Sequence, residues 1–330
     1  MNGSFFGLLE LVALAYLLVA LGISAASAMF YPFLRERLNR VSPADRASWL
    51  VALCATPAAG ALLLTGLCLL PSADISWWPA VDHCPDHHQT GHPHLCLAHL
   101  PETAGSVAGL VGMAVLVLLL AVLTTEAIRT AALGRRLKKL GAGNSKGLDE
   151  GVREIESALP MAATVGVFRP RVLVSSRLRE SIPKELLAVV CAHEQAHVRR
   201  RDPLRKAAAK LFSLLHLPWV RRRMLDDLGL ACEQACDEEA AQRSGDRLLV
   251  ARALLAVERL LSKHQLVLPD AVSAFGGDRI GARVESLVDA AVPRTRAWAR
   301  AWLPGLLIFL IGMADRVHHT TETLLGLVTR

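Results

Sequence analysis

Apolar residues gather in long runs that are typical of membrane-spanning helices. Three of these runs cover residues 5–29, 49–70 and 104–123. Each reaches the roughly 20 residues that a helix needs to cross about 30 Å of hydrocarbon. A shorter run over 301–314 is accompanied by Trp298 and Trp302, aromatic residues that favour the membrane interface, and we expect a fourth span there. The first run could alternatively be a signal peptide, because Ala26-Ser27-Ala28 resembles a cleavage site. Its length and the lack of a basic residue before it favour a span.

Lysine and arginine are distributed very unevenly between the segments that join these runs. Residues 34–48 contain four of the 37, residues 126–300 contain 31, and residues 71–103 contain none. Because cytoplasmic segments carry the excess of positive charge, we expect the N-terminus and residues 71–103 outside and residues 126–300 in the cytoplasm. The chain is thus predicted to be a multi-pass protein of the inner or plasma membrane.

The composition changes this picture little. With 52% hydrophobic residues the chain is neither disordered nor fibrous. Its net charge of +7 is explained by basic segments beside anionic headgroups, so the lipid bilayer is the expected partner of those segments. No nucleic-acid-binding motif is evident, and we expect no direct binding of nucleic acid.

Residues 126–300 show the pattern of a mostly helical domain with a small β-sheet. A helical pattern is found at 148–159, and β-branched residues predict a pair of strands at 164–168 and 171–175. Further helices are expected at 183–201, 204–216, 223–244 and 247–264, with a loop at 273–278. The predicted fold class is a mainly α membrane protein with four transmembrane helices and a cytoplasmic α+β domain between the third and fourth.

An H-E-x-x-H motif, His193 to His197, lies inside the helix expected at 183–201. Residues four apart share one face of a helix, so His193 and His197 can present two imidazole nitrogens to one Zn²⁺. Glu194 is placed to act as the base that activates a metal-bound water. A chance match of this motif in a chain of this composition is improbable, and the motif predicts a metal-dependent hydrolase.

A catalytic zinc usually has three protein ligands and one open position. Glu233 is the candidate for the third ligand, because it opens an E-x-x-x-D motif on the helix expected at 223–244. Asp237 lies one turn further on the same face and could accept a hydrogen bond from the second nitrogen of a ligating histidine. Cys191, Cys232 and Cys236 are offset from these positions, and we expect them to be buried structural thiols that point elsewhere.

These motifs, in this order and between these spans, resemble the BlaR/MecR-type membrane zinc peptidases. The likeness includes Val165-Gly166-Val167-Phe168, similar to part of that family's strand pair before the active-site helix, and the E-x-x-C-D run from Glu233 to Asp237. The resemblance implies a gluzincin-like fold in which His193, His197 and Glu233 hold one Zn²⁺, Glu194 is the base and Asp237 orients His193. It also suggests a transcriptional repressor as the protein substrate.

The resemblance divides the chain into three parts: residues 1–125 with three spans, a cytoplasmic zinc-peptidase domain at 126–300, and a fourth span with a short tail at 301–330. The antibiotic receptors of this family carry a penicillin-binding sensor after the last span, and the 16 residues from 315 onwards do not contain one. We therefore expect a membrane zinc endopeptidase that acts in signalling, without support for β-lactam sensing. An extended substrate could add to the strand edge at Val165, Gly166, Val167 and Phe168.

The expected outer loop, 71–103, contains six of the 12 histidines together with Cys84 and Cys96. A Cys84–Cys96 disulfide in an oxidising compartment is the favoured interpretation, and metal sensing by the histidines is the alternative. Two other functions stay open for the whole chain. One is a non-catalytic receptor or scaffold with a structural metal site, and the other is a metal-sensing membrane protein.

Overall fold

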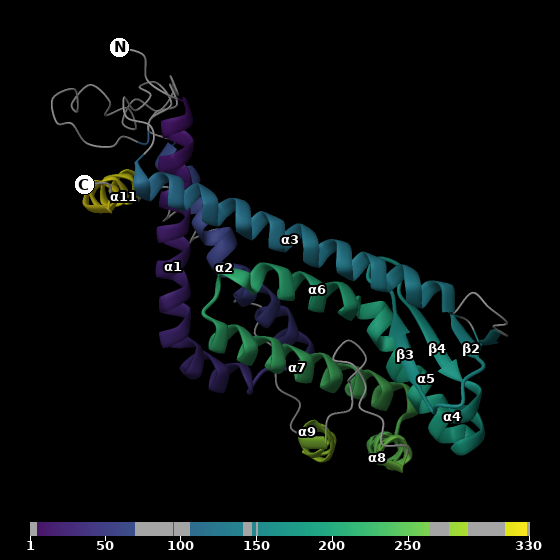
Figure 1. Ribbon diagram of the computed structural model, residues 1–330. Coiled ribbons are helices and arrows are strands. Elements are labelled where there is room, and N and C mark those ends of the chain that lie inside the picture. Colours follow the sequence, from purple (N-terminus) through teal and green to yellow (C-terminus); the bar gives the residue numbers. More distant parts are fainter. Residues whose placement is uncertain are drawn as a thin grey trace, which may run out of the picture.

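Three long helices form the membrane part of the computed structural model, which describes residues 5–69, 95, 106–140, 147–149, 151–263, 277–289 and 314–328. They are α1 (Phe5–Leu38), α2 (Pro43–Leu69) and α3 (Val107–Leu140). All three are long and apolar enough to cross a membrane, as the sequence predicts. Helix α1 packs along α2, and α3 extends from them over the rest of the molecule (Figure 1). The predicted fourth span at 301–314 lies outside the described residues, and α11 (Ala314–Val328) begins where it would end.

A four-stranded sheet forms the far end of the domain (Figure 1). Its strands are β1 (Gly147–Asp149), β2 (Val152–Ile155), β3 (Ala162–Val165) and β4 (Arg171–Ser175), in the spatial order β1-β2-β4-β3. Strand β4 pairs parallel to β2 and antiparallel to β3, so β3 forms one edge of the sheet. The hairpin predicted before the active-site helix is therefore confirmed.

Two sequence predictions in this region are wrong. The helix expected at 148–159 is replaced by β1 and β2, because Val152 pairs with Val172 and is almost fully buried in the sheet. The first strand of the hairpin ends at Val165, so Gly166, Val167 and Phe168 belong to the connection. Gly166 has a φ of 99°. A Cβ there would lie 2.9 Å from the Arg169 carbonyl oxygen, which is why the turn needs glycine.

The helical elements of the domain are α4 (Ser176–Ser181), α5 (Lys184–Arg200), α6 (Asp202–Phe212), a short 3₁₀ turn (Ser213–Leu215), α7 (Pro218–Ser244), α8 (Arg247–Lys263) and α9 (Gly277–Val288). Of these, α4, α5, α7, α8 and α9 pack around an apolar core beside the sheet, whereas Ala209 of α6 belongs to a second cluster with α1 and α2. Helix α5 contacts β3 and β4 on one side and α7 and α8 on the other. Helix α7 begins earlier than predicted because Pro218 stands in its first turn, where proline is preorganised for a helix. Helix α9 begins at Gly277, inside the predicted loop.

Helix α7 also joins the domain to the membrane helices. Its residues Met224, Leu228 and Cys232 share a buried cluster with residues of α1 and α2. Beside this cluster, Asp227 accepts hydrogen bonds from the Arg35 guanidinium at 2.6 and 3.0 Å and from the Tyr31 hydroxyl at 2.8 Å. The first two spans and α7 therefore form one packed unit.

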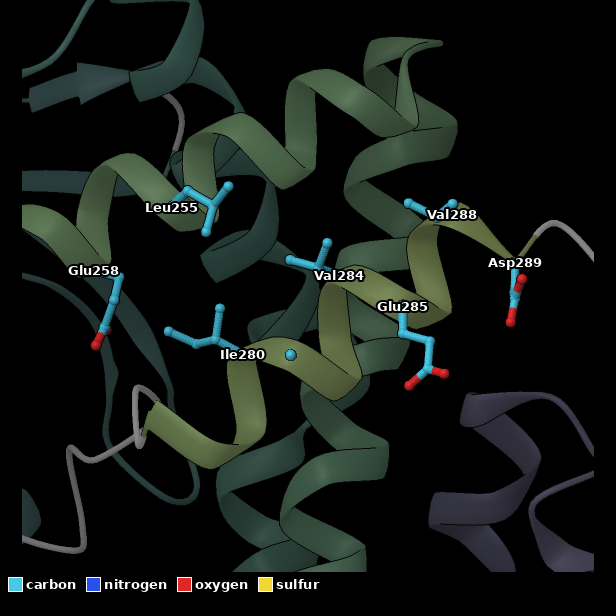
Figure 2. Close-up of a pocket in the computed structure, with 8 residues that line it drawn as sticks. Leu255, Glu258, Ile280, Val284, Glu285, Val288 and Asp289 are labelled. Atoms are coloured by element: carbon cyan, nitrogen blue, oxygen red, sulfur yellow. The ribbon is translucent and has the colours of Figure 1, made fainter.

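A groove runs between α8 and α9 on the surface of the domain (Figure 2). Its volume is about 660 Å³, and its lining combines apolar side chains with three carboxylates from Glu258, Glu285 and Asp289. None of the histidines or acids singled out by the motifs lines it. The groove is thus separate from the candidate site.

Candidate metal centre

Two helices bring three metal-binding side chains together in the interior of the domain. His193 and His197 lie one turn apart on α5, and Glu233 faces them from α7. One ligand atom from each lies within 4.8 Å of the others, and all three residues are buried. The Nε2 atoms of His193 and His197 lie 3.4 and 3.6 Å from the two carboxylate oxygens of Glu233. The helix register that the motifs predict therefore brings these residues to one point.

The environment of these atoms fits a metal. Nε2 of His193 and Oε2 of Glu233 are buried, and neither has a hydrogen-bond partner in the described part of the chain. Buried polar atoms are normally satisfied, so two facing atoms without partners are what a shared cation would explain. Two imidazoles and one carboxylate are also a donor set typical of catalytic zinc sites.

Glu233 is surrounded by positive charge. Lys206 Nζ on α6 lies 3.1 Å from its Oε1, and Arg283 Nη1 on α9 lies 3.6 Å from its Oε2. Burial by itself would raise the pKa of Glu233, but Lys206 and His197 outweigh that effect and hold this pKa well below its usual range. The carboxylate is therefore ionised and able to bind a cation.

Asp237 lies behind His193. Its Oδ1 is 2.9 Å from Nδ1 of His193, on the ring edge opposite the cluster. Arg283, which has no exposed surface, donates from Nε and Nη2 to both oxygens of Asp237 at 2.7 Å. Sequence reasoning did not find Arg283, because nothing in its local sequence separates it from the many surface arginines.

A second acid, Asp202, lies behind His197. Its Oδ2 is 2.9 Å from Nδ1 of His197, and Cys236 Sγ lies 3.2 Å from the same nitrogen. The expectation that Cys236 points away from the histidines is therefore wrong, because α7 approaches α5 closely enough for the residue before Asp237 to reach the other ring. Cys232 fits the expectation, since it is buried in the cluster with α1 and α2. Asp202 was not singled out from the sequence, although it comes directly after the histidine-bearing helix.

Glu194 is tied to the edge strand of the sheet. The Thr164 hydroxyl on β3 lies 2.8 Å from Oε2 of Glu194 and 2.9 Å from its backbone oxygen. Glu194 is itself buried, while Phe168, three residues beyond the strand's end, is 81% exposed. Strand β3 therefore lies beside the predicted base, and of the four residues predicted to bind substrate only Val165 belongs to this strand. Cys84 and Cys96, predicted to form a disulfide, lie outside the described residues.

Comparison with known proteins gives one match. The family model described as BlaR1 peptidase M56 matches residues 98–287, more than half of the chain. All the residues of the cluster and Arg283 lie within this range. No curated protein and no solved structure matches the chain. Because this family model covers more than half of the chain, including α3, the chain belongs to the BlaR1 peptidase family M56.

Proposed function

We propose that the chain is a membrane zinc endopeptidase that binds one Zn²⁺ through His193, His197 and Glu233. The observation that carries this proposal is the convergence of three buried ligand atoms beside Glu194. A structural zinc site would be closed by a fourth protein ligand, whereas a catalytic site keeps a position open. Among the described residues no fourth acid, histidine or cysteine is grouped with these three, and Glu194, next to His193 in the sequence, has its carboxylate bonded to Thr164 of the edge strand.

The residues divide the chemistry between them. A zinc ion bound here would polarise the scissile carbonyl and lower the pKa of a water. Glu194 accepts the proton of that water on a carboxylate oxygen and passes it to the nitrogen of the leaving amine, so that no net proton is gained or lost. Asp237, whose Oδ1 lies 2.9 Å from Nδ1 of His193, is placed to take the Nδ1–H when the ring turns its Nε2 to a bound ion, and would thereby orient this ligand.

The substrate is an extended segment of a cytoplasmic or membrane-adjacent protein. Strand β3 is an edge strand, and an extended peptide can pair with such an edge through its backbone. The chain continues from Val165 through Gly166, Val167 and Phe168, which would lengthen the docking surface. The family resemblance suggests a signalling role, with a transcriptional repressor as one candidate substrate.

The proposed arrangement in the membrane follows the charge distribution. Residues 1–125 contain three spans with the N-terminus outside, residues 126–300 form the cytoplasmic peptidase domain, and residues 301–330 contain the fourth span and an outer tail. A Cys84–Cys96 disulfide would close the outer loop. This places the metal centre on the cytoplasmic side of the inner or plasma membrane.

The proposal is tested with the detergent-purified full chain by elemental analysis and by a casein proteolysis assay. We expect about one zinc per chain in the wild type, and its loss in His193→Ala, His197→Ala and Glu233→Ala. Glu194→Gln should keep the zinc and lose about 10²- to 10⁴-fold in rate, because general-base catalysis contributes that much.

The matched control is Glu185→Gln, which changes an exposed glutamate in the first turn of the same helix. It should keep both zinc and activity. Wild-type protein without stoichiometric metal, or equal proteolysis by wild type and Glu194→Gln, would contradict the proposal.

A further inference from the structure

His197 makes its contacts on one ring edge with two side chains that have no role in the chemistry above. Asp202 Oδ2 lies 2.9 Å from His197 Nδ1, and Cys236 Sγ lies 3.2 Å from that nitrogen and 3.3 Å from the same Oδ2. The three atoms form a closed triangle of contacts. Both residues are fully buried, with no exposed surface.

The Asp202 carboxylate is directed at this ring. Its Oδ2 contacts His197 Nδ1, Cys236 Sγ and, at 3.3 Å, the Nε of Arg200. Its other oxygen, Oδ1, has no hydrogen-bond partner among the described residues. Arg200 and Cys236 both donate to this oxygen, and a carboxylate surrounded by donors accepts from each of them, so His197 Nδ1 is assigned as the third donor.

The backbone places Asp202 there. Helix α5 ends at Arg200, and the next residue, Arg201, has a φ of 54°, a left-handed conformation that few residues other than glycine adopt. This single residue turns the chain sharply from α5 into α6, so Asp202 lies back against His197 only five positions earlier.

The Cys236 thiol lies on the edge of the His197 imidazole that faces away from Glu233. It contacts Nδ1, while the metal-binding edge of the ring is Nε2, 3.6 Å from Glu233. The thiol donates its S–H to Oδ2 of Asp202 at 3.3 Å.

We infer that Asp202 and Cys236 are positioning residues for His197, an inference that rests on the proposed metal site. Asp202 accepts the Nδ1–H and thereby fixes the tautomer whose Nε2 lone pair faces the metal. Cys236 donates to Asp202 and limits rotation of both side chains. The cysteine of the E-x-x-C-D run thus serves the histidine of a different motif.

The experiment measures metal binding by the full chain in detergent after the metal has been removed with a chelator. The probes are Zn²⁺, with affinity determined by competition with a chromophoric chelator, and Co²⁺, whose visible absorption reports ligand geometry. The variants are Asp202→Asn, Cys236→Ala and Cys236→Ser. The control is Cys232→Ala, which removes an equally buried thiol one turn earlier on α7 that makes no hydrogen bond to His197.

We expect Asp202→Asn to weaken zinc binding about 10- to 100-fold, as the loss of a residue that orients a metal-bound histidine commonly does. Cys236→Ala should weaken it about fivefold, the effect of one ordinary hydrogen bond. Cys236→Ser keeps a donor and should bind zinc within about twofold of the wild type. The cobalt spectrum should change in Asp202→Asn and Cys236→Ala and stay as in the wild type for Cys232→Ala.

Thermal unfolding of the metal-free proteins distinguishes a role in stabilising the fold from a role in positioning His197. Cys236→Ala and Cys232→Ala each lose one buried thiol, so their chelated forms should have similar unfolding midpoints, while only Cys236→Ala gains less stability from zinc. If Asp202→Asn and Cys236→Ala bind zinc as tightly as Cys232→Ala, the inference is overturned and the proposed function stands. If the wild type binds no metal, both are overturned.

Discussion

The two histidines of the cluster are equivalent in the motif, but the structure supports them in different ways. Behind His193 stands an ion pair, in which Asp237 is held at both oxygens by Arg283 from α9. Behind His197 stand Asp202, from the start of α6, and a neutral thiol from α7. One side depends on a helix distant in sequence, and the other is assembled by a sharp turn next to the motif. The comparison shows that two identical ligands can be supported by residues whose substitution costs very different amounts of free energy.

The difference lies mainly in buried charge. Removing one partner of a buried ion pair leaves the other charged and unpaired, which costs far more than the loss of a neutral contact. The Asp237–Arg283 pair has at most 1% exposure on either side chain. Behind His197, Asp202 makes a longer 3.3 Å contact with Arg200, whose side chain is 13% exposed, and the thiol carries no charge. We therefore expect the His193 side to be the more sensitive to substitution.

The largest effect is expected for Arg283→Met. It leaves Asp237 and Glu233 buried with less compensating charge and should lower the free energy of unfolding by about 3–5 kcal/mol. Thermal or urea unfolding of the metal-free protein in detergent measures this. Arg279→Met is the matched control, one turn earlier on α9 in an exposed pair with Asp226, and should cost at most about 1 kcal/mol. Equal losses of unfolding free energy in the two variants would show that the buried Asp237–Arg283 pair stabilises the fold no more than the exposed pair does.

The next effect compares the two acids directly. Asp237→Asn should weaken zinc binding about 10- to 100-fold, and by more than Asp202→Asn does, because it also leaves Arg283 without its bidentate partner. Zinc affinities from chelator competition, measured on both variants in parallel, test the order. A larger loss in Asp202→Asn would reverse the comparison.

The smallest effect is expected for a substitution that contacts neither histidine. Thr164→Val removes the hydroxyl that lies 2.8 Å from Oε2 of Glu194. The loss of one hydrogen bond to a charged group is worth about 1.5–3 kcal/mol, so we expect kcat to fall about tenfold or more. Zinc content and zinc affinity should be unchanged. A fall in zinc affinity would mean that Thr164 supports the ligands rather than the base.

Much of the centre could be predicted from the sequence because it depends on helix periodicity. His193 and His197 are four apart, as are Glu233 and Asp237, and that spacing fixes a common face on α5 and on α7 whatever surrounds them. The meeting of the two faces required only that α5 pack against α7. For this reason the geometry of the four residues agrees with what their spacing predicts.

The remaining features of the fold and of the centre depend on tertiary contacts that leave no pattern in the neighbouring sequence. Arg283 lies 46 residues after Asp237 and becomes special only when α9 covers α7. Strand β2 shows a helical pattern in isolation and becomes a strand because β4 pairs with it. Asp202 could have been predicted from the sequence, because an acid directly after a histidine-bearing helix can fold back on the last turn of that helix.

The contact of α7 with α1 and α2 links the candidate metal centre mechanically to two apolar helices. Asp227, held by Arg35 and Tyr31 of α1, and Glu233, facing the two histidines, belong to the same unbroken helix. They are six positions apart, about 9 Å along the helix axis at 1.5 Å per residue. A helix segment of this length is stiff, so in the proposed membrane arrangement a tilt of α1 and α2 is expected to shift Glu233. Bilayer thickness and lateral tension would then act on the candidate metal centre.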